Sequence, residues 1–267
     1  MNMENADNIA GTANFEFEVV NLSKCFSGIR AIDGISFKIK HEQVVSVIGP
    51  NGAGKTTLIN LLSGALLPDS GKVFFSQRNV ARFPAHKRVS LGICRTFQLE
   101  ELFTSMTVLE NAMVGCHLSG NSGILSAGFH FKKERKEEAL IKSKAFHNLK
   151  LIGLEEKAFQ RVSNLPLGER KLLGVVRALG TRPRLLMLDE PTGGLAAYEV
   201  VKFKELILSL LQNGLRILLV EHNVPFVMSI SQRIIVLNYG RKIADGAPGV
   251  VKNNPEVIRA YLGDSDW

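Results

Sequence analysis

The sequence contains few cysteines and lacks a long apolar run, and both features narrow the class of protein. Its 267 residues include Cys25, Cys94 and Cys116, which are widely spaced and lack the paired spacing of metal ligands. We therefore expect reduced thiols in a cytosolic protein. Because no apolar stretch approaches the ~20 residues that span a bilayer, any membrane role must come through a partner.

The N-terminus, MNMENADNIAGTANFEF, carries acidic residues and lacks an apolar run, which excludes a secretory signal and a membrane anchor. The formal net charge of +8 suits a protein that handles a polyanion or works beside an anionic membrane face. The one dense basic run, FKKERKEEALIKSK (131–144), mixes both signs at helical spacing. This pattern favours a solvated helix face over nucleic-acid binding.

Apolar spacing predicts two kinds of strand. FEFEVV (15–20) and GISFKIK (34–40) alternate between apolar and polar residues, which is typical of half-buried antiparallel strands. In contrast, VVSVI (44–48), LLMLD (185–189) and RILLVE (216–221) are short and nearly all apolar, as in a parallel sheet that helices cover on both sides. We expect an α/β fold with a mixed sheet and an antiparallel β subdomain.

Helical spacing follows the first buried strand and ends at Gly64. The pattern between residues 99 and 164 is mostly helical, which predicts a helical subdomain inserted into the sheet domain. RIIVLNYGRKIADG predicts a hairpin that turns at 238–240. In the tail, Asn254 is placed as an N-cap and Pro255 as the first residue of a helix.

A glycine-rich stretch lies between the apolar strand 44–48 and this first helix, and it fits the phosphate-binding pattern G-x-x-x-x-G-K-[ST]. Glycines let such a loop curl so that its backbone N–H groups face a phosphate, although a chance glycine-rich turn is the alternative. Lys55 would reach the β- and γ-phosphates, and the Thr56 hydroxyl would hold Mg²⁺. The expected nucleotide-binding residues here are Gly49, Pro50, Asn51, Gly52, Ala53, Gly54, Lys55, Thr56 and Thr57.

LLMLDEP supplies a second element of the site. An apolar strand delivers Asp189 to its carboxyl end, where the ligands of open α/β sheets collect, and Asp189 would hold Mg²⁺. Glu190 follows it and is the candidate for orienting the attacking water. Its alternative is a plain helix-start carboxylate before Pro191.

Five motifs, taken in this order, resemble the ATP-binding cassette family of P-loop NTPases over residues 15–246. They are the phosphate loop (49–56), RTFQ (95–98), LPLGER (165–170), LMLDEP (186–191) and VEHN (220–223). The resemblance implies a cassette ATPase domain at 15–246, with its helical subdomain at about 99–170. We expect residues 1–14 to be disordered and 247–267 to form a short helical extension.

The same resemblance implies roles for three further residues. Gln98 would contact Mg²⁺ and water and would link that site to the helical subdomain and a membrane partner. His222 would contact the γ-phosphate, and Phe26 would stack on adenine. Taken singly, each has a plainer alternative as a loop glutamine, a strand-end histidine or a core phenylalanine.

The segment at 165–169 departs from the family pattern L-S-G-G-Q, with which one cassette binds the nucleotide of its partner. Pro166 has neither the serine hydroxyl nor an N–H, while Gly168 is retained for binding in trans. We expect Pro166 to be tolerated as the first helical residue. A second departure, Ala196, replaces the acidic or amide residue that connects the two nucleotide sites. Both favour an asymmetric heterodimer, although a homodimer is possible.

The tail, VLNYGRKIADGAP followed by NNPEVIRAYLG, resembles the larger ATP-binding subunit of bacterial branched-chain amino-acid importers. This implies an ATPase that uses ATP and Mg²⁺ at the cytoplasmic face of the bacterial plasma membrane. Its partners would be a second cassette subunit, integral-membrane permease subunits and, indirectly, a periplasmic or extracellular binding protein, with no nucleic acid. The alternatives are a poorly hydrolysing regulatory subunit and an ATPase for another cargo, such as lipid export.

Overall fold

The structure is a computed structural model that describes residues 17–39, 44–96, 102–117 and 131–262. In these ranges the strands are β1 (Phe17–Phe26), β2 (Ile29–Ile39), β3 (Val44–Ile48), β4 (Ser70–Phe75), β5 (Arg78–Asn79), β6 (Ile93–Arg95), β7 (Leu185–Asp189), β8 (Arg216–Val220), β9 (Arg233–Asn238) and β10 (Arg241–Gly246). They form an antiparallel sheet of order β2-β1-β4-β5 and a mixed sheet of order β10-β9-β3-β8-β7-β6.

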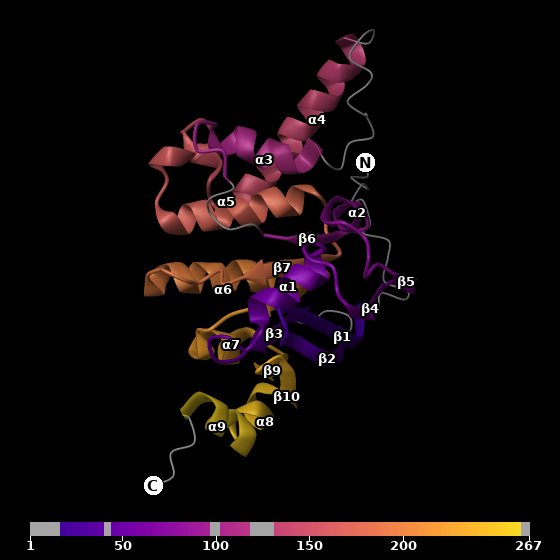
Figure 1. The fold of residues 1–267 in the computed structure, drawn as a ribbon. Helices are drawn as coiled ribbons and strands as arrows, with labels where there is room; N and C mark the ends of the chain where they lie inside the picture. Colours follow the sequence, from indigo (N-terminus) through magenta and orange to yellow (C-terminus); the bar gives the residue numbers. More distant parts are fainter. Residues whose placement is uncertain (1–16, 40–43, 97–101, 118–130, 263–267) are drawn as a thin grey trace, which may run out of the picture.

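The helices separate into groups that cover different parts of these sheets (Figure 1). They are α1 (Lys55–Ser63), α2 (Ala85–Ser90), α3 (Val108–His117), α4 (Phe131–Lys150), α5 (Leu167–Gly180), α6 (Ala197–Gln212), α7 (Val224–Ile230), α8 (Pro248–Lys252) and α9 (Pro255–Leu262), with short 3₁₀ turns η2 (Glu155–Lys157) and η3 (Val162–Asn164). The part of the chain that the structure describes has no helix with the length and apolar character needed to cross a bilayer.

The strands β3, β7 and β8 form the centre of the mixed sheet, as their apolar runs predicted. All five residues of β3 are buried, and because side chains alternate along a strand, the two faces of β3 enter different cores. Val45 and Val47 pack with α1 and the antiparallel sheet, whereas Val44 and Ile48 pack with the helices α5, α6 and α7. A strand with both faces covered needs side chains that are apolar or hydrogen-bonded, and the one polar residue of β3, Ser46, is bonded through its hydroxyl to that of Ser231.

The antiparallel pair predicted near the N-terminus is also present. β1 and β2 pair in antiparallel register, with Val19 opposite Phe37, and both of these side chains are buried. Both strands are longer than the predicted alternating segments at the end nearer the turn that connects them. β1 continues to Phe26, and β2 starts at Ile29. The inward face of this sheet packs on Leu58 and Leu62 of α1 in one core cluster.

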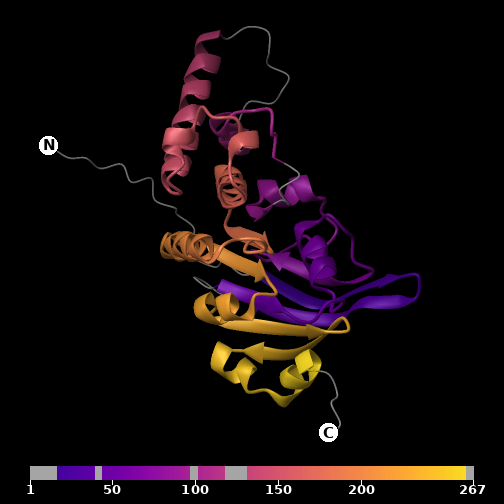
Figure 2. The same ribbon diagram turned by 90° about the vertical axis from the view of Figure 1, so that its left-hand side faces the viewer.

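Helices α3, α4 and α5 form the helical lobe, which the chain enters after β6 and leaves before β7 (Figures 1 and 2). Its own apolar core includes Leu109, Ala145 and Leu173, one from each helix. The lobe is therefore a packed unit inserted into the sheet domain. Together, the mixed sheet, the antiparallel sheet and this lobe confirm the predicted fold class.

The C-terminal part begins with the predicted hairpin of β9 and β10, which turns at Tyr239 and Gly240. The short helix α8 lies within the helical extension expected at 247–267. Helix α9 starts at Pro255 as predicted, and the Asn254 Oδ1 atom accepts a hydrogen bond of 2.9 Å from the Glu256 N–H. This bond satisfies one of the donors that every helix start leaves free.

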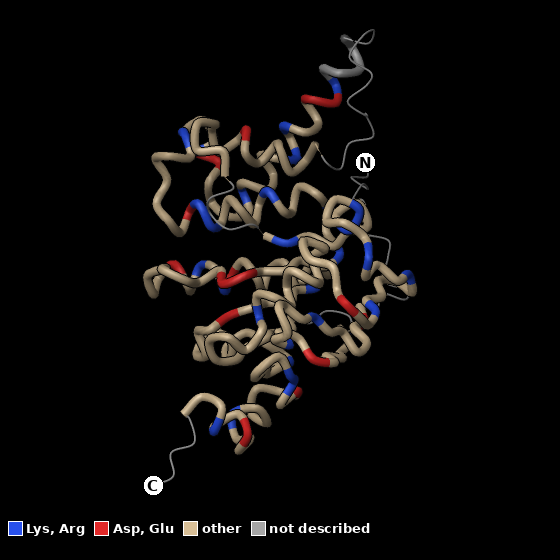
Figure 3. Tube along the Cα trace, viewed as in Figure 1, with Lys and Arg blue, Asp and Glu red and all other residues tan. Residues whose placement is uncertain are grey.

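Charged side chains are spread over the layers of the fold (Figure 3). The mixed-charge run 131–144 lies within α4, as its helical spacing predicted. Basic and acidic residues both occur in the helical lobe, around the central sheet and near the C-terminal helices.

Candidate nucleotide-binding and hydrolysis site

The predicted site residues meet because three neighbouring parallel strands end at one edge of the mixed sheet. In the paired register, Val220 of β8 lies opposite both Val47 of β3 and Asp189 of β7. The chain leaving β3 forms the phosphate loop, the chain leaving β8 carries His222, and the chain leaving β7 carries Glu190. Motifs that are far apart in the sequence are thus joined by strand register.

The phosphate loop is held in its curled shape by close backbone approaches. A Cβ atom on Gly49 would lie 2.2 Å from the Leu237 carbonyl oxygen, and one on Gly54 would lie 2.4 Å from that of Ala31. Both glycines have positive φ angles, so any other residue at either position would be strained as well as crowded. The hydrogen bond of 3.1 Å from Gly240 N–H to the Ala53 carbonyl fixes the loop to the β9–β10 turn.

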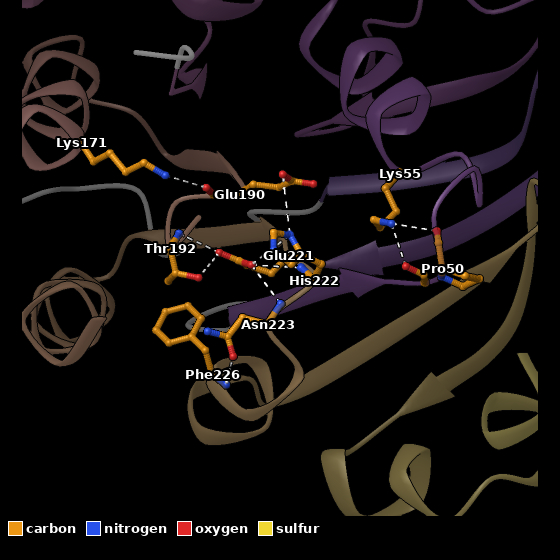
Figure 4. Close-up of polar contacts among 10 residues, drawn as sticks. Pro50, Lys55, Lys171, Glu190, Thr192, Glu221, His222, Asn223 and Phe226 are labelled. Atoms are coloured by element: carbon orange, nitrogen blue, oxygen red, sulfur yellow. Dashed lines mark hydrogen bonds and ion pairs between the residues drawn. The ribbon is translucent and has the colours of Figure 1, made fainter. Parts of the chain in front are cut away.

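Lys55 points back into this loop. Its Nζ atom donates to the carbonyl oxygens of Gly49 and Pro50 at 2.7 Å and 2.9 Å, which leaves one of the three ammonium hydrogens for a ligand (Figure 4). Burial lowers the pKa of Lys55, and the Glu190 carboxylate opposes this effect. The side chain is therefore a buried cation on the inner side of the loop.

Asp189 is paired with an arginine from the neighbouring strand. The Arg95 Nη2 atom lies 2.6 Å from Oδ2 of Asp189, and Nη1 of the same guanidinium donates to Asn60 Oδ1 on α1 at 2.6 Å. Arg95 therefore connects the end of β6, the end of β7 and the helix that follows the phosphate loop. Sequence reasoning assigned Arg95 only to a motif and did not foresee this pair.

Glu190 and His222 face each other across the same edge, with 3.7 Å between Glu190 Oε2 and His222 Nδ1 (Figure 4). Both side chains are about half exposed. Glu190 has φ 46°, a left-handed backbone that is uncommon for residues other than glycine. Its carbonyl oxygen accepts a hydrogen bond of 3.1 Å from Lys171 Nζ of α5, so the strained turn is tied to the helical lobe.

A buried carboxylate that sequence reasoning did not single out lies behind this pair. Glu221 is fully buried, and its Oε1 atom accepts hydrogen bonds from the N–H and the hydroxyl of Thr192 at 2.8 Å and 2.6 Å. Its Oε2 atom accepts from the N–H groups of His222 and Asn223 at 3.0 Å and 3.2 Å. The signal in the sequence was an acidic residue directly after the apolar run of β8.

The segment around Pro166 differs in one detail from the expectation. Helix α5 begins at Leu167, so Pro166 is the N-cap residue and not the first helical residue. The consequence is the same, because the N–H of an N-cap residue makes no intrahelical bond either. Glu169 forms an ion pair of 2.6 Å with Lys157, so part of its negative charge is balanced within the lobe.

Gly168 and Ala196 lie close to one carboxylate of α6. A Cβ atom on Gly168 would lie 2.2 Å from Oε1 of Glu199, and Oε2 of Glu199 accepts the Ala196 N–H at 2.8 Å. Because Ala196 has no side-chain acceptor, the usual reciprocal bond of a capping box is absent. The start of α5 is therefore packed against the start of α6 in the same chain.

The remaining two predicted residues are Phe26 and Gln98. Phe26, at the end of β1, is 45% exposed, and the Lys24 ammonium lies 5.6 Å from its ring centroid. The ring is therefore a surface aromatic and not the core phenylalanine of the plainer reading. Gln98 lies outside the described residues.

These groups suit a nucleoside triphosphate with a magnesium ion. Mg²⁺ in nucleotide sites takes one or two protein oxygens and completes its shell with phosphate oxygens and water. Thr56, at the first turn of α1, is exposed. Among the described residues, Arg95 bonds Oδ2 of Asp189, which leaves Oδ1 for a metal. The same residues contain no cluster of three or more His, Cys, Asp or Glu side chains that would form an all-protein metal site.

The fold and this edge define a P-loop nucleotide hydrolase with an inserted helical lobe. Residues 32–193 match the family model described as ABC transporter, and residues 241–266 match the model described as branched-chain amino acid ATP-binding cassette transporter. The first match spans more than half of the chain. The chain therefore belongs to the ABC transporter family of ATP-hydrolysing cassettes, which confirms the resemblance inferred from the motifs.

Curated relatives agree in sequence and in length. The chain is 40% identical over 249 residues to the high-affinity branched-chain amino acid transport ATP-binding protein BraF of Pseudomonas aeruginosa, covering 93% of this chain and 98% of the relative. It is 39% identical to the corresponding LivG protein of Escherichia coli, covering 90% and 94%. Among solved structures, a nucleotide-free cassette from an ABC transporter superposes with a TM-score of 0.82 at 31% identity, covering 94% of this chain and all of that one.

Proposed function

We propose that this chain is the ATP-hydrolysing subunit of a membrane importer for branched-chain or related amino acids. The observation that carries the proposal is the alignment of the phosphate loop, Asp189, Glu190 and His222 at one sheet edge, in a chain whose tail matches the branched-chain cassette model. The full-length similarity to BraF and LivG supports this cargo class over lipid export.

In this proposal the phosphate loop and Lys55 bind the triphosphate, and Thr56, Asp189 and Gln98 hold Mg²⁺. The metal, when bound, neutralises charge that develops on the phosphate oxygens. Glu190 orients the attacking water and His222 contacts the γ-phosphate. Phe26 supports the adenine ring, for which its exposed face is suited.

The chain acts with membrane subunits at the cytoplasmic face of the plasma membrane. Affinity purification of the full-length chain from detergent-solubilised membranes of its host should recover integral-membrane companions. Proteoliposomes that contain this complex, supplied with the cognate binding protein, should take up leucine, isoleucine or valine only when ATP and Mg²⁺ are present on the cassette side. Recovery of the chain without any integral-membrane companion contradicts the importer role.

The cassette dimer in this proposal is asymmetric. Pro166 offers neither a hydroxyl nor an N–H to the nucleotide of the partner, and the Glu199 carboxylate lies against Gly168 at the start of α5. Loss of one hydrogen bond to a charged group weakens a contact by about 1.5–3 kcal/mol. The site completed by this chain in trans is therefore the weaker one, while its own half-site keeps the hydrolytic residues.

Turnover of the reconstituted complex tests the asymmetry. Glu190→Gln in this chain should abolish most ATP hydrolysis, whereas the equivalent change in the partner cassette should remove a smaller part. An equal loss from the two changes contradicts the asymmetric arrangement and favours two equivalent sites.

A further inference from the structure

Glu221 stands out among the buried groups because it lies directly behind the two exposed candidates for hydrolysis without being accessible itself. Its side chain has no solvent exposure, so it cannot contact a nucleotide or a water at the sheet edge. Its carboxylate nevertheless lies close to the imidazole of His222, with 4.0 Å between Oε2 and Nδ1 (Figure 4). Any effect of Glu221 on hydrolysis must therefore be transmitted through its neighbours.

The four hydrogen bonds to Glu221 come from two different segments. Oε1 is bonded by the backbone and side chain of Thr192, two positions after Glu190, and Oε2 by the backbone of His222 and Asn223. A second tie between the segments is the hydrogen bond of 2.8 Å from Glu190 N–H to the Val220 carbonyl. Together these bonds bracket the turn that holds Glu190 in its left-handed conformation.

The chemistry of these donors requires a carboxylate. Each oxygen of Glu221 faces at least one backbone N–H, and a backbone N–H can only donate. A glutamine of the same shape would turn its NH₂ group toward one of these donors in either orientation. Burial of a charge is costly unless it is paired or fully hydrogen-bonded, so a residue needed only for packing would be apolar here.

Lys171 of α5 supplies a positive charge near Glu221 and Glu190. Its Nζ atom donates to the Glu190 carbonyl, and while burial lowers the pKa of Lys171, the carboxylates of Glu221 and Glu190 oppose this effect. The buried carboxylate thus faces a partly buried ammonium across the turn that carries Glu190.

We propose that Glu221 is a positioning residue for hydrolysis, whose carboxylate joins the segment after β7 to the segment after β8 and so sets the distance between Glu190 and His222. This inference rests on the proposed role of these two residues. It predicts an effect on the chemical step and little effect on ATP affinity, because the phosphate loop and Lys55 are held by separate contacts.

The test compares Glu221→Gln and Thr192→Val with Thr192→Ser in the full-length chain, reconstituted with its partner cassette, at a temperature well below the unfolding midpoint of each variant. Glu221→Gln should lower kcat for ATP by about 10- to 100-fold with KM changed less than about threefold, as a misplacement of roughly 1 Å can cost a factor of 100. Thr192→Val, which removes only the hydroxyl donor, should lower kcat by a smaller factor, and Thr192→Ser, which keeps it, should restore kcat.

The double variant Glu221→Gln with Thr192→Val should be no slower than Glu221→Gln alone, because both changes break the same contact. If folded Glu221→Gln has the kcat of the wild type, the proposal is overturned. A change confined to KM, with kcat unaltered, overturns it as well. If Glu221→Gln does not fold, the kcat of Thr192→Val is the test, and an unchanged kcat in that variant overturns the proposal. Failure of the complex that contains the wild-type chain to hydrolyse ATP would contradict the proposed function itself, which is a distinguishable result.

Discussion

The guanidinium of Arg95 binds the carboxylate of Asp189 at 2.6 Å, at the point where a magnesium ligand is expected. Both side chains are largely buried, so removal of the arginine leaves a carboxylate without its counter-charge. Breaking a buried pair in this way costs about 3–5 kcal/mol, and the small solvent exposure that both side chains keep places the effect toward the lower value.

We therefore expect Arg95→Met to lower the unfolding midpoint strongly in EDTA and less strongly with ATP and Mg²⁺, because the metal supplies positive charge to Asp189. Differential scanning fluorimetry under the two conditions measures both shifts. Arg259→Met, which removes an exposed arginine of α9, is the matched control. Equal destabilisation of Arg95→Met in the two conditions contradicts a metal site at Asp189.

Lys55→Met should weaken ATP binding at least about tenfold, because it removes a buried cation that contacts the loop at 2.7 Å and 2.9 Å and would contact the phosphates. Isothermal titration with Mg·ATP measures the change. Lys252→Met, at the exposed end of α8, should bind ATP like the wild type. Unchanged affinity in Lys55→Met would exclude the phosphate loop as the triphosphate site.

Arg88 is a fully buried guanidinium that donates to the carbonyl oxygens of Leu61 and Leu62 at the end of α1, at 2.7 Å and 2.6 Å. It also donates to the carbonyls of Phe83 and Ala81, and burial lowers its pKa to about 10. A cation at this end of a helix favours the helix dipole as well as the orphan carbonyls.

Arg88→Met should reduce the free energy of unfolding by about 3 kcal/mol or more, because it leaves several buried carbonyls without donors. Urea titration followed by circular dichroism measures this loss, and Arg82→Met, at an exposed neighbouring arginine, should cost little. A loss no larger than that of the control would show that Arg88 does not hold the end of α1.

The Asp245 carboxylate joins β10 to β9 through two bonds from Arg233, at 2.6 Å and 2.8 Å, and it accepts a third bond from Lys242 of its own strand at 2.8 Å. Burial raises its pKa, but the bonds from Arg233 and Lys242 outweigh this effect and leave the pKa below the ordinary value of 3.8. A carboxylate whose pKa is lower in the folded than in the unfolded state stabilises the fold. This stabilisation is complete at pH values above the unfolded-state pKa and is lost as the pH falls through the folded-state pKa.

Asp245→Asn should therefore lower the free energy of unfolding by about 1.5–3 kcal/mol at neutral pH, and the difference from wild type should shrink as the pH falls below 3.8. Unfolding in urea at a series of pH values tests this dependence. Asp69→Asn removes an exposed pair with Lys24 and should matter less because solvent screens it. A pH-independent difference would show that Asp245 does not act through its charge.

Local patterns predicted the part of the site that depends on local structure. The continuous apolar run of β3, the glycines after it and the start of α1 all act within a few residues, so 44–64 could be interpreted without tertiary information. The carboxyl ends of β7 and β8 were placed correctly because apolar runs of this kind form parallel sheets, which collect their ends at one edge.

Contacts between distant segments were not predictable in this way. Glu221 bonds Thr192, which lies 29 positions away, and Arg95 bonds Asp189, 94 positions away. Arg88 follows another basic residue in a polar stretch, where nothing local indicates that its side chain is fully buried. Each of these residues acquires its role from strand register and packing, which a pattern of single residues does not contain.

Phosphate release by the reconstituted complex of this chain with its partner cassette tests the central claim most directly, with ATP and Mg²⁺ as substrate and with Glu190→Gln and the exposed-site control Glu205→Gln of this chain measured in parallel. The account predicts magnesium-dependent hydrolysis by the wild type and by Glu205→Gln. It predicts that Glu190→Gln binds ATP within about threefold of wild type while releasing phosphate about 100-fold more slowly. A folded wild-type chain without magnesium-dependent ATP binding, or undiminished turnover by Glu190→Gln, would contradict it.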